Sequence, residues 1–160
     1  MSEEAAEGLL ATHTADYEWL LTHTGEELTE GRHYWEVEIV DRKRGGLNLG
    51  VCRPDADPRA AHDEREDTTT WLMNAGGGSL WGNGKQNDDY AGGFSNGDRM
   101  GILLDLDDGS LRFFKNGVEH GPGYPAGSVT GPVARAVQMY FAGHAARLLL
   151  DAAWPAGHAP

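Results

Sequence analysis

The chain has 160 residues, of which 39% are hydrophobic and 24% are charged, as is typical of one globular domain and not of a disordered segment. Its formal net charge is −12, with 25 Asp and Glu against 13 Lys and Arg. A surface of that charge repels nucleic-acid phosphates and anionic lipid headgroups, so we expect neither nucleic acid nor a membrane as partner and favour a protein or peptide that carries Lys or Arg.

The N-terminal segment, residues 1–16, is rich in Ala, Glu and Thr and shows little periodicity, which predicts a loosely docked arm or a short helix. It lacks the basic start and apolar run of a signal peptide. No apolar stretch approaches the length of about 20 residues that a membrane-spanning helix needs. These features predict an intracellular, cytoplasmic protein.

Strand signals begin after this arm, and the domain is expected to occupy residues 17–151 with a tail at 152–160. Residues 34–39 alternate between apolar and polar side chains, the pattern of an antiparallel strand with one solvated face. A second strand over 47–51 leads to Cys52, the one cysteine, which we interpret as a small buried hydrophobic side chain. A β domain without a disulfide fits a reducing compartment.

The middle of the chain is less regular. Residues 53–67 are polar, contain two prolines and predict a long loop, a class of segment that often carries function. The β-branched and aromatic run at 68–73 predicts a strand. Residues 74–98 combine Gly, Asn and scattered aromatic residues, with a short strand expected at 79–81.

The clearest local signal is a three-stranded meander. An apolar strand over 99–106 is followed by a turn at Asp108-Gly109, a returning strand over 110–114, a turn at Asn116-Gly117 and a third strand. Asp-Gly and Asn-Gly between apolar runs are strong hairpin signals, because both pairs tolerate positive φ. Two more strands are expected near 134–140 and 145–150. About ten short strands predict an all-β sandwich or barrel.

Five segments resemble, in order and spacing, the SPRY domain family. They are Gly31–Ile39 with Leu49–Cys52, Trp71–Asn74, the Gly-Asp-x-x-Gly-x-x-x-Asp pattern at 97–105, Leu111–Gly117 and Gly131-Pro132-Val133. The resemblance covers about residues 17–150. The N-terminal segment does not resemble the extended PRY region of tripartite-motif and butyrophilin proteins, and the 82–96 stretch is unusually rich in Gly, Asn and Asp.

The resemblance implies a bent two-layer antiparallel β-sandwich, a concanavalin-like jelly roll, that binds a peptide or protein epitope without catalysis. Family members supply substrate recognition to ubiquitin ligases, as SOCS-box adaptors do, or occur in scaffolds. Binding in the family uses loops at one end of the sandwich. Carried over by position, the expected partner-binding residues are Asp55, Trp71, Met73, Gln138, Met139, Tyr140 and Phe141.

Periodicity leaves the direction of several of these side chains open. Trp71 and Met73 are two apart on one strand and therefore share a face, which is either the partner-binding face or the core. In the first case Asp55 would receive a cation at the rim. Tyr140 and Phe141 are adjacent, so one of the two is expected to point inward.

Other chemistry is poorly supported. Glu36 and Glu38 share a strand face at a spacing that glycoside hydrolysis uses, but paired acids on a solvated strand are far commoner. The Asp105–Gly109 segment lacks the later oxygen ligands of a calcium loop. The seven histidines show no metal-binding spacing. We therefore expect no enzyme activity, no metal and no cofactor.

One alternative function remains open. The Gly- and Asn-rich stretch contains Trp81, Asn83 and Tyr90, residue types that stack on sugars and hydrogen-bond to them. A lectin-like sandwich that binds glycan through these residues is the competing hypothesis.

Overall fold

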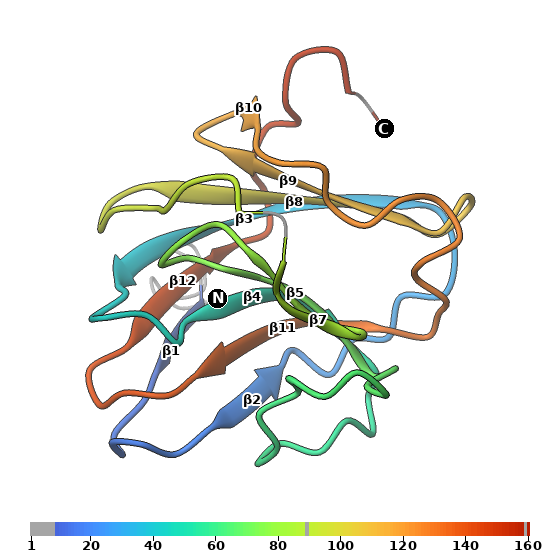
Figure 1. The fold of residues 1–160 in the computed structure, drawn as a ribbon. Coiled ribbons are helices and arrows are strands. Elements are labelled where there is room, and N and C mark those ends of the chain that lie inside the picture. The colour runs from blue at the N-terminus through green and yellow to red at the C-terminus, as the bar shows by residue number, and fades with distance from the viewer. Residues whose placement is uncertain (1–8, 89, 159) are drawn as a thin grey trace.

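The structure, a computed structural model, describes residues 9–88, 90–158 and 160. Within these residues, twelve strands form two antiparallel six-stranded sheets packed face to face, and there is no helix, hence none able to span a membrane (Figure 1). The predicted two-layer antiparallel β-sandwich is confirmed. The layers are visible in Figure 1 as the upper group around β3, β8 and β9 and the lower group around β4, β5 and β11.

The first sheet has the order β1-β12-β3-β8-β9-β10. Its strands are β1 (Leu9–Thr12), β12 (Ala145–Leu149), β3 (Arg32–Asp41), β8 (Arg99–Asp105), β9 (Ser110–Lys115) and β10 (Val118–Glu119). The predicted meander forms its second half, because β8, β9 and β10 pair consecutively. Asn116 and Gly117 both have positive φ, 51° and 87°, which is what the tight turn between β9 and β10 requires.

The second sheet has the order β2-β11-β4-β5-β6-β7. Its strands are β2 (Leu20–His23), β11 (Ala134–Met139), β4 (Asn48–Cys52), β5 (Thr70–Asn74), β6 (Leu80–Gly82) and β7 (Lys85–Asp88). Strand β11 lies between β2 and β4, so it becomes a neighbour of β2, which is more than 100 residues away in sequence. Gly50 on β4 is needed for close packing, because a Cβ there would lie 2.0 Å from the carbonyl oxygen of Trp71.

The main core lies between the sheets. Its largest fully buried side chains include Trp35, Trp71, Phe94, Phe113 and Tyr124. Strand β5 is buried on both faces: Trp71 and Met73 point into this core, while Leu72 belongs to a smaller cluster on the outer face of the second sheet. That outer face is partly covered by the 53–69 loop, seen at the lower right of Figure 1.

The segment expected as a loose arm contributes a strand. Leu9–Thr12 form β1, which pairs with β12 at the edge of the first sheet, in register from Leu9 opposite Leu148 to Thr12 opposite Ala145. The rest of the expected arm up to residue 8 lies outside the described residues. At the other terminus, Trp154 of the tail packs on Tyr34, with ring centroids 5.8 Å apart, and Arg32 lies over its ring.

The strand directions gather three connections at one end of the sandwich. Residues 13–19 join β1 to β2, residues 42–47 join β3 to β4, and residues 140–144 join β11 to β12. These three segments, on the left in Figure 1, are called the loop end. The β4–β5 connection, residues 53–69, starts at the opposite end.

Candidate functional site

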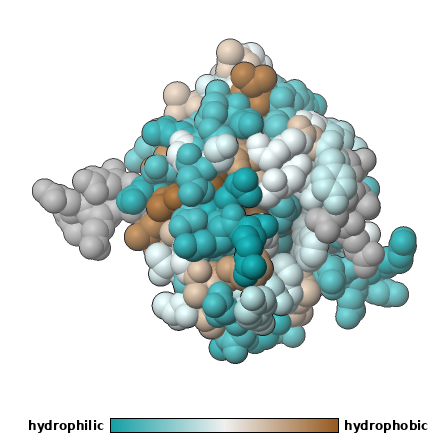
Figure 2. Space-filling model, turned by 60° about the vertical axis from the view of Figure 1, so that its left-hand side comes forward, coloured by the Kyte–Doolittle hydropathy of each residue, from teal (hydrophilic) through white to brown (hydrophobic). Residues whose placement is uncertain are grey.

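Five aromatic side chains gather at the loop end and on the adjoining outer face of the second sheet. Called here the aromatic patch, they are Tyr17, Trp19, Trp81, Tyr140 and Phe141, with successive ring centroids 4.5–6.0 Å apart. Tyr17 is 64% exposed and the other four are half-buried. Figure 2 looks toward the loop end, where strongly hydrophobic residues form only small areas within a hydrophilic and neutral surface.

The register of β2 against β11 brings these residues together. Leu20 lies opposite Met139, so the residues just before β2 meet the residues just after β11. The Asp16 carboxylate accepts a hydrogen bond from the Ala142 backbone N–H at 2.9 Å, which ties the two connections to each other. Gly46 allows the third connection to approach, because a Cβ there would lie 2.8 Å from the Cβ of Tyr140.

A cation completes the patch. The Arg44 guanidinium lies over the Phe141 ring at 4.6 Å from its centroid, and it donates a hydrogen bond to the Tyr17 hydroxyl at 3.4 Å. The Arg44 side chain is exposed. Aromatic residues and Arg are the types that most often dominate binding energy in protein interfaces.

A buried histidine holds the 140–144 turn. Nδ1 of His144 accepts hydrogen bonds from the backbone N–H groups of Tyr140 and Phe141, both at 3.1 Å, and Nε2 donates to the Arg42 carbonyl at 3.0 Å. Burial lowers the pKa of His144; its bonds to the Arg42 and Gly45 carbonyls oppose this, and the charge of His13 adds to it. The ring is therefore neutral, with its proton on Nε2.

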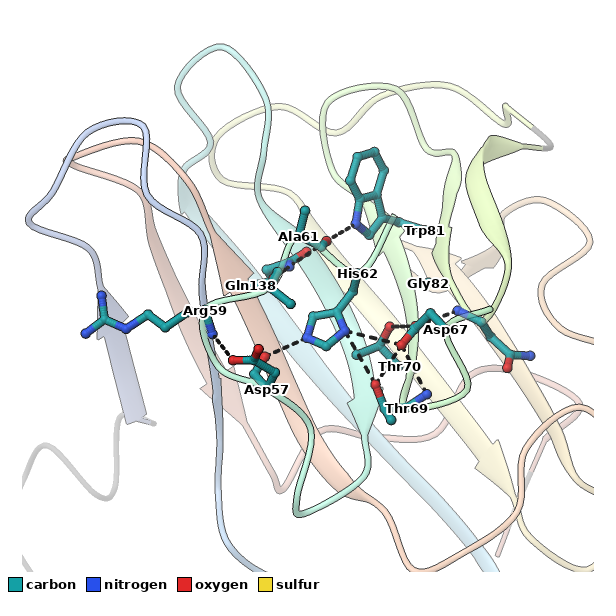
Figure 3. A network of polar contacts seen from close by, with 12 residues as sticks. Asp57, Arg59, Ala61, His62, Asp67, Thr69, Thr70, Trp81, Gly82 and Gln138 are labelled. Atoms are coloured by element: carbon teal, nitrogen blue, oxygen red, sulfur yellow. Dashed lines mark hydrogen bonds and ion pairs between the residues drawn. The ribbon is translucent and has the colours of Figure 1, made fainter. Parts of the chain in front are cut away.

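The 53–69 loop contacts the patch at Trp81 and is called here the far wall of the patch; Figure 3 shows the polar contacts of this loop. The Ala61 carbonyl accepts hydrogen bonds from the Trp81 indole at 2.8 Å and from the Gln138 side chain at 2.9 Å. Gln138 is itself fully buried and accepts a bond from Asn48. This loop therefore fixes the position of Trp81, on which Trp19 packs.

Asp67 ties this loop to the second sheet (Figure 3). Its carboxylate accepts bonds from the hydroxyls of Thr69 and Thr70, from the backbone N–H of Asn83 and from His62. Burial alone would raise the pKa of Asp67, but these donors outweigh it and hold the pKa well below its ordinary value of 3.8. The carboxylate is consequently charged at neutral pH.

The structure places four of the seven predicted contact residues in the interior. Trp71 and Met73 face the main core and are 2% and 0% exposed, so the core interpretation is correct and the surface one is not. Leu72, which alternates with them on β5, is buried on the opposite face in the smaller cluster. Met139 is also in the main core, and Gln138 is buried beneath the 53–69 loop.

The other three predicted residues reach the surface but do not form one site. Tyr140 and Phe141 both belong to the aromatic patch and both are half-buried, although one of them was expected to point inward. Asp55 is exposed and follows β4 at the end of the sandwich opposite the loop end. Sequence reasoning did not single out Tyr17, Trp19 and Arg44, which the structure brings beside Tyr140 and Phe141. A signal was the presence of two aromatic residues within 17–19.

Of the residues of the glycan hypothesis, Trp81 belongs to the aromatic patch, whereas Tyr90 is exposed outside it. Asn83 and Tyr90 lie near opposite ends of β5, because Asn83 bonds to Asp67 while Tyr90 packs on Gly77. The Glu36 carboxylate accepts bonds from Tyr34 and Arg99, and Glu38 pairs with Arg147.

The described residues include no group of three or more His, Cys, Asp or Glu side chains able to hold a metal. The Asp105–Gly109 segment is a turn: Asp105 accepts bonds from the N–H groups of Asp107 and Asp108.

Cys52 is expected to be inert in the folded chain. It is 0% exposed, and burial raises the pKa of its thiol to about 12. Because the thiolate is the reactive form, iodoacetamide at neutral pH will leave the native protein unmodified and alkylate it fully in guanidinium chloride, as mass spectrometry will show. Full alkylation of the native protein would contradict the burial of this residue.

Comparison with known proteins agrees with the fold. The sequence profile of the SPRY domain matches residues 32–150. Butyrophilin subfamily 1 member A1 of Mus musculus is 32% identical over 91 residues, and the E3 ubiquitin-protein ligase TRIM11 of Bos taurus is 34% identical over 89 residues. Each alignment covers 56% of this chain but only 16% and 18%, respectively, of the relative, so the chain spans less than a fifth of these proteins.

Two solved human structures have the same architecture. The SPRY domain of human HERC1 has a TM-score of 0.76 at 23% identity, covering 90% of this chain and 89% of that one. Another human SPRY domain has a TM-score of 0.73 at 24% identity, covering 90% and 92%. At this identity the two structures establish the fold alone.

Proposed function

This chain belongs to the SPRY domain family, whose members in general are protein interaction modules, and we propose that it binds a short peptide or a protein epitope through the aromatic patch. The observation that carries this proposal is the gathering of five partly exposed aromatic rings and one arginine at the loop end. Large rigid aromatic side chains give contact area at a low cost in conformational entropy.

The order of the patch supports the proposal. Its connections are held by backbone hydrogen bonds to Asp16 and His144, and its far wall is held by the bond from Trp81 to Ala61. A surface that is ordered before binding loses less entropy when a partner docks. The patch therefore has the chemistry and the rigidity of a recognition surface.

The chemistry of the partner follows from charge. The domain carries a net charge of −12, which attracts a partner rich in Lys or Arg and speeds their encounter. The proposed ligand is a peptide segment with apolar or aromatic side chains for the patch and basic residues around them. Nucleic acid and anionic membranes are disfavoured by the same charge.

The biological setting is part of the proposal. One relative is an E3 ubiquitin-protein ligase, so the domain is proposed to select substrates for a ligase or to dock within a scaffold. A reducing, intracellular compartment fits a chain whose one cysteine is a buried free thiol. The domain would then hold its partner and leave any chemistry to another protein.

The probe is a peptide selected from a random displayed library for binding to the wild-type chain. Replacing Tyr17 with alanine is expected to weaken the binding of this peptide by at least about tenfold. The reason is that Tyr17 is the most exposed ring of the patch and contacts both Tyr140 and Phe141. Its exposure also means that the free energy of unfolding will change little. Isothermal titration calorimetry measures the affinity, and denaturant unfolding measures the stability.

The matched control is Tyr90→Ala, because Tyr90 is an equally exposed tyrosine, at 70%, that lies outside the patch. This variant is expected to bind with wild-type affinity. Equal affinities for the wild type and the Tyr17→Ala variant would move the binding surface away from the patch. A loss of affinity in Tyr90→Ala alone would instead favour the Gly- and Asn-rich stretch.

A further inference from the structure

We propose that two buried histidines confine the working form of the aromatic patch to a window of pH, because His62 must carry a proton on each ring nitrogen whereas His144 must keep one nitrogen bare. The inference rests on the proposed function, since it concerns the surface assigned there to partner binding. Each histidine holds a different side of the patch.

His62 holds the wall formed by the 53–69 loop (Figure 3) and is 6% exposed. Its Nε2 lies 2.7 Å from the Asp57 carbonyl oxygen, and its Nδ1 lies 3.3 Å from the Asp67 carboxylate. The Thr69 hydroxyl is 3.4 Å from Nδ1, but its hydrogen is directed to Asp67 at 2.7 Å. All three oxygens therefore accept, and both ring nitrogens must donate.

The surroundings of His62 are acidic. Burial opposes its charged form, but the hydrogen bond and negative charge of Asp67, with the carbonyl and charge of Asp57, raise its pKa above the ordinary 6.5. The other charged groups that line the same hollow are Asp63, Glu64 and Glu66. From β5 and the β6–β7 turn the neighbours are neutral, namely the two threonines and the Asn83 N–H that bond to Asp67.

Loss of the His62 proton would release the wall. A bare ring nitrogen would face either the Asp57 carbonyl or the Asp67 carboxylate, and the two lone pairs would repel. The segment just before His62 supplies the carbonyls that bind Trp81 and Gln138, and its Pro58 carbonyl binds the Leu21 N–H. Trp81 would lose its indole partner, and Trp19 would lose a fixed neighbour.

His144 imposes the opposite requirement. Its Nδ1 accepts two backbone N–H groups, so a proton there would face two donors and break both bonds. The charged groups around it are His13, Asp41 with its partner Lys43, and Arg44 over the adjoining Phe141 ring. Protonation would therefore loosen the turn that presents Tyr140 and Phe141.

The signs of the two shifts define the window. His62 has a raised pKa, so its contribution is complete below the ordinary value of 6.5 and is lost as the pH rises through the raised value. His144 has a lowered pKa, so its contribution is complete above 6.5 and is lost as the pH falls through the lowered value. Both requirements are best met near pH 6.5.

The structural test needs no ligand. In the whole ¹⁵N-labelled chain, titrated from about pH 5.5 to about pH 8.5, the Trp81 indole N–H resonance is expected to shift on the alkaline side. The Tyr140 and Phe141 amides are expected to shift on the acid side. His62→Gln will abolish the alkaline-side change in chemical shift, and His144→Gln will abolish the acid-side change. His23 is an exposed histidine on β2, and His23→Gln will leave both changes in place. If His144→Gln does not fold, the wild-type titration decides for that residue.

The functional test uses the library-selected peptide as probe. Its affinity is expected to fall at least about threefold from pH 6.5 to either end of the range. The inference would be overturned if the chemical shifts of these resonances did not change with pH, or if the Tyr140 and Phe141 amides shifted on the alkaline side. If the chemical shifts did not change with pH but Tyr17→Ala still weakened peptide binding, the pH inference would fail and the proposed function would stand. If both changes in chemical shift occurred but the peptide affinity did not change with pH, the patch would not be the binding surface and the histidines would not regulate binding.

Discussion

Replacing Trp71 with alanine is expected to lower the free energy of unfolding by about 3–5 kcal/mol, the range observed when a large aromatic side chain is removed from a core. Trp71 is 2% exposed between the two sheets, and its indole N–H donates to the Ser128 carbonyl at 3.0 Å. Arg53 lies over its ring. Truncation to alanine would leave a cavity in the core and would also leave the Ser128 carbonyl without this donor. Denaturant unfolding measures the loss.

The Trp71 result separates a core residue from a contact residue. Any loss of peptide binding in Trp71→Ala is expected to follow the loss of folded protein and to disappear when the folded fraction is restored at low temperature. Val118→Ala is the control, because Val118 is 71% exposed on β10 and its truncation will change stability by about 0.5 kcal/mol or less. Wild-type stability with lost binding in Trp71→Ala would place Trp71 on the binding surface.

Replacing Asp67 with alanine is expected to cost about 3–5 kcal/mol of unfolding free energy, because removing one partner of a buried charge pair leaves the other uncompensated. The Asp67 side chain is 8% exposed and receives bonds from both threonines, from Asn83 and from His62. Without the carboxylate these donors lack an acceptor, and the 53–69 loop loses its attachment to β5. Denaturant unfolding at pH 6.5 will measure this cost.

Two variants sharpen the Asp67 experiment. Asp67→Asn keeps an acceptor oxygen but not the charge, so its cost is expected to fall between those of the wild type and Asp67→Ala. Glu64→Ala removes an exposed acid from the same loop and is expected to leave stability within about 0.5 kcal/mol. Equal stabilities for Asp67→Ala and Glu64→Ala would show that the network in Figure 3 does not hold the loop.

Local sequence signals were sufficient for most strands. The alternation at 34–39 lies within β3, and the apolar run with its Asp-Gly and Asn-Gly turns became β8, β9 and β10. These signals depend on residues close in sequence, namely side-chain period and turn residues that accept positive φ. Strand β1 had no such signal, because four residues paired along one edge are stabilised mainly by their partner β12.

Sequence periodicity could not predict which way the Trp71 and Met73 side chains point, and the reason is physical. An alternating pattern reveals which face is buried only when the other face is solvated. Strand β5 has apolar residues on both faces, since the 53–69 loop covers the side where Leu72 lies. The sequence therefore predicts the strand but not which of its faces meets the main core.

The aromatic patch could be predicted only in part. Tyr140 and Phe141 were expected as contact residues because the family resemblance implied them by position, and both belong to the patch. Tyr17 and Trp19 join them because β2 pairs with β11, a contact between segments more than 100 residues apart. Such a register depends on how the whole sheet is ordered, which local composition does not encode.

Mapping where a selected peptide binds tests the aromatic patch as a binding surface most directly. Comparing ¹⁵N spectra of the free and peptide-bound chain at pH 6.5, we predict that the largest shifts fall on Tyr17, Trp19, Arg44, Tyr140 and Phe141 and on the Trp81 indole. Resonances at the opposite end, including Asp55, are expected to stay in place. Shifts centred on that opposite end, or on the Asn83 turn, would contradict the assignment of the aromatic patch as the binding surface.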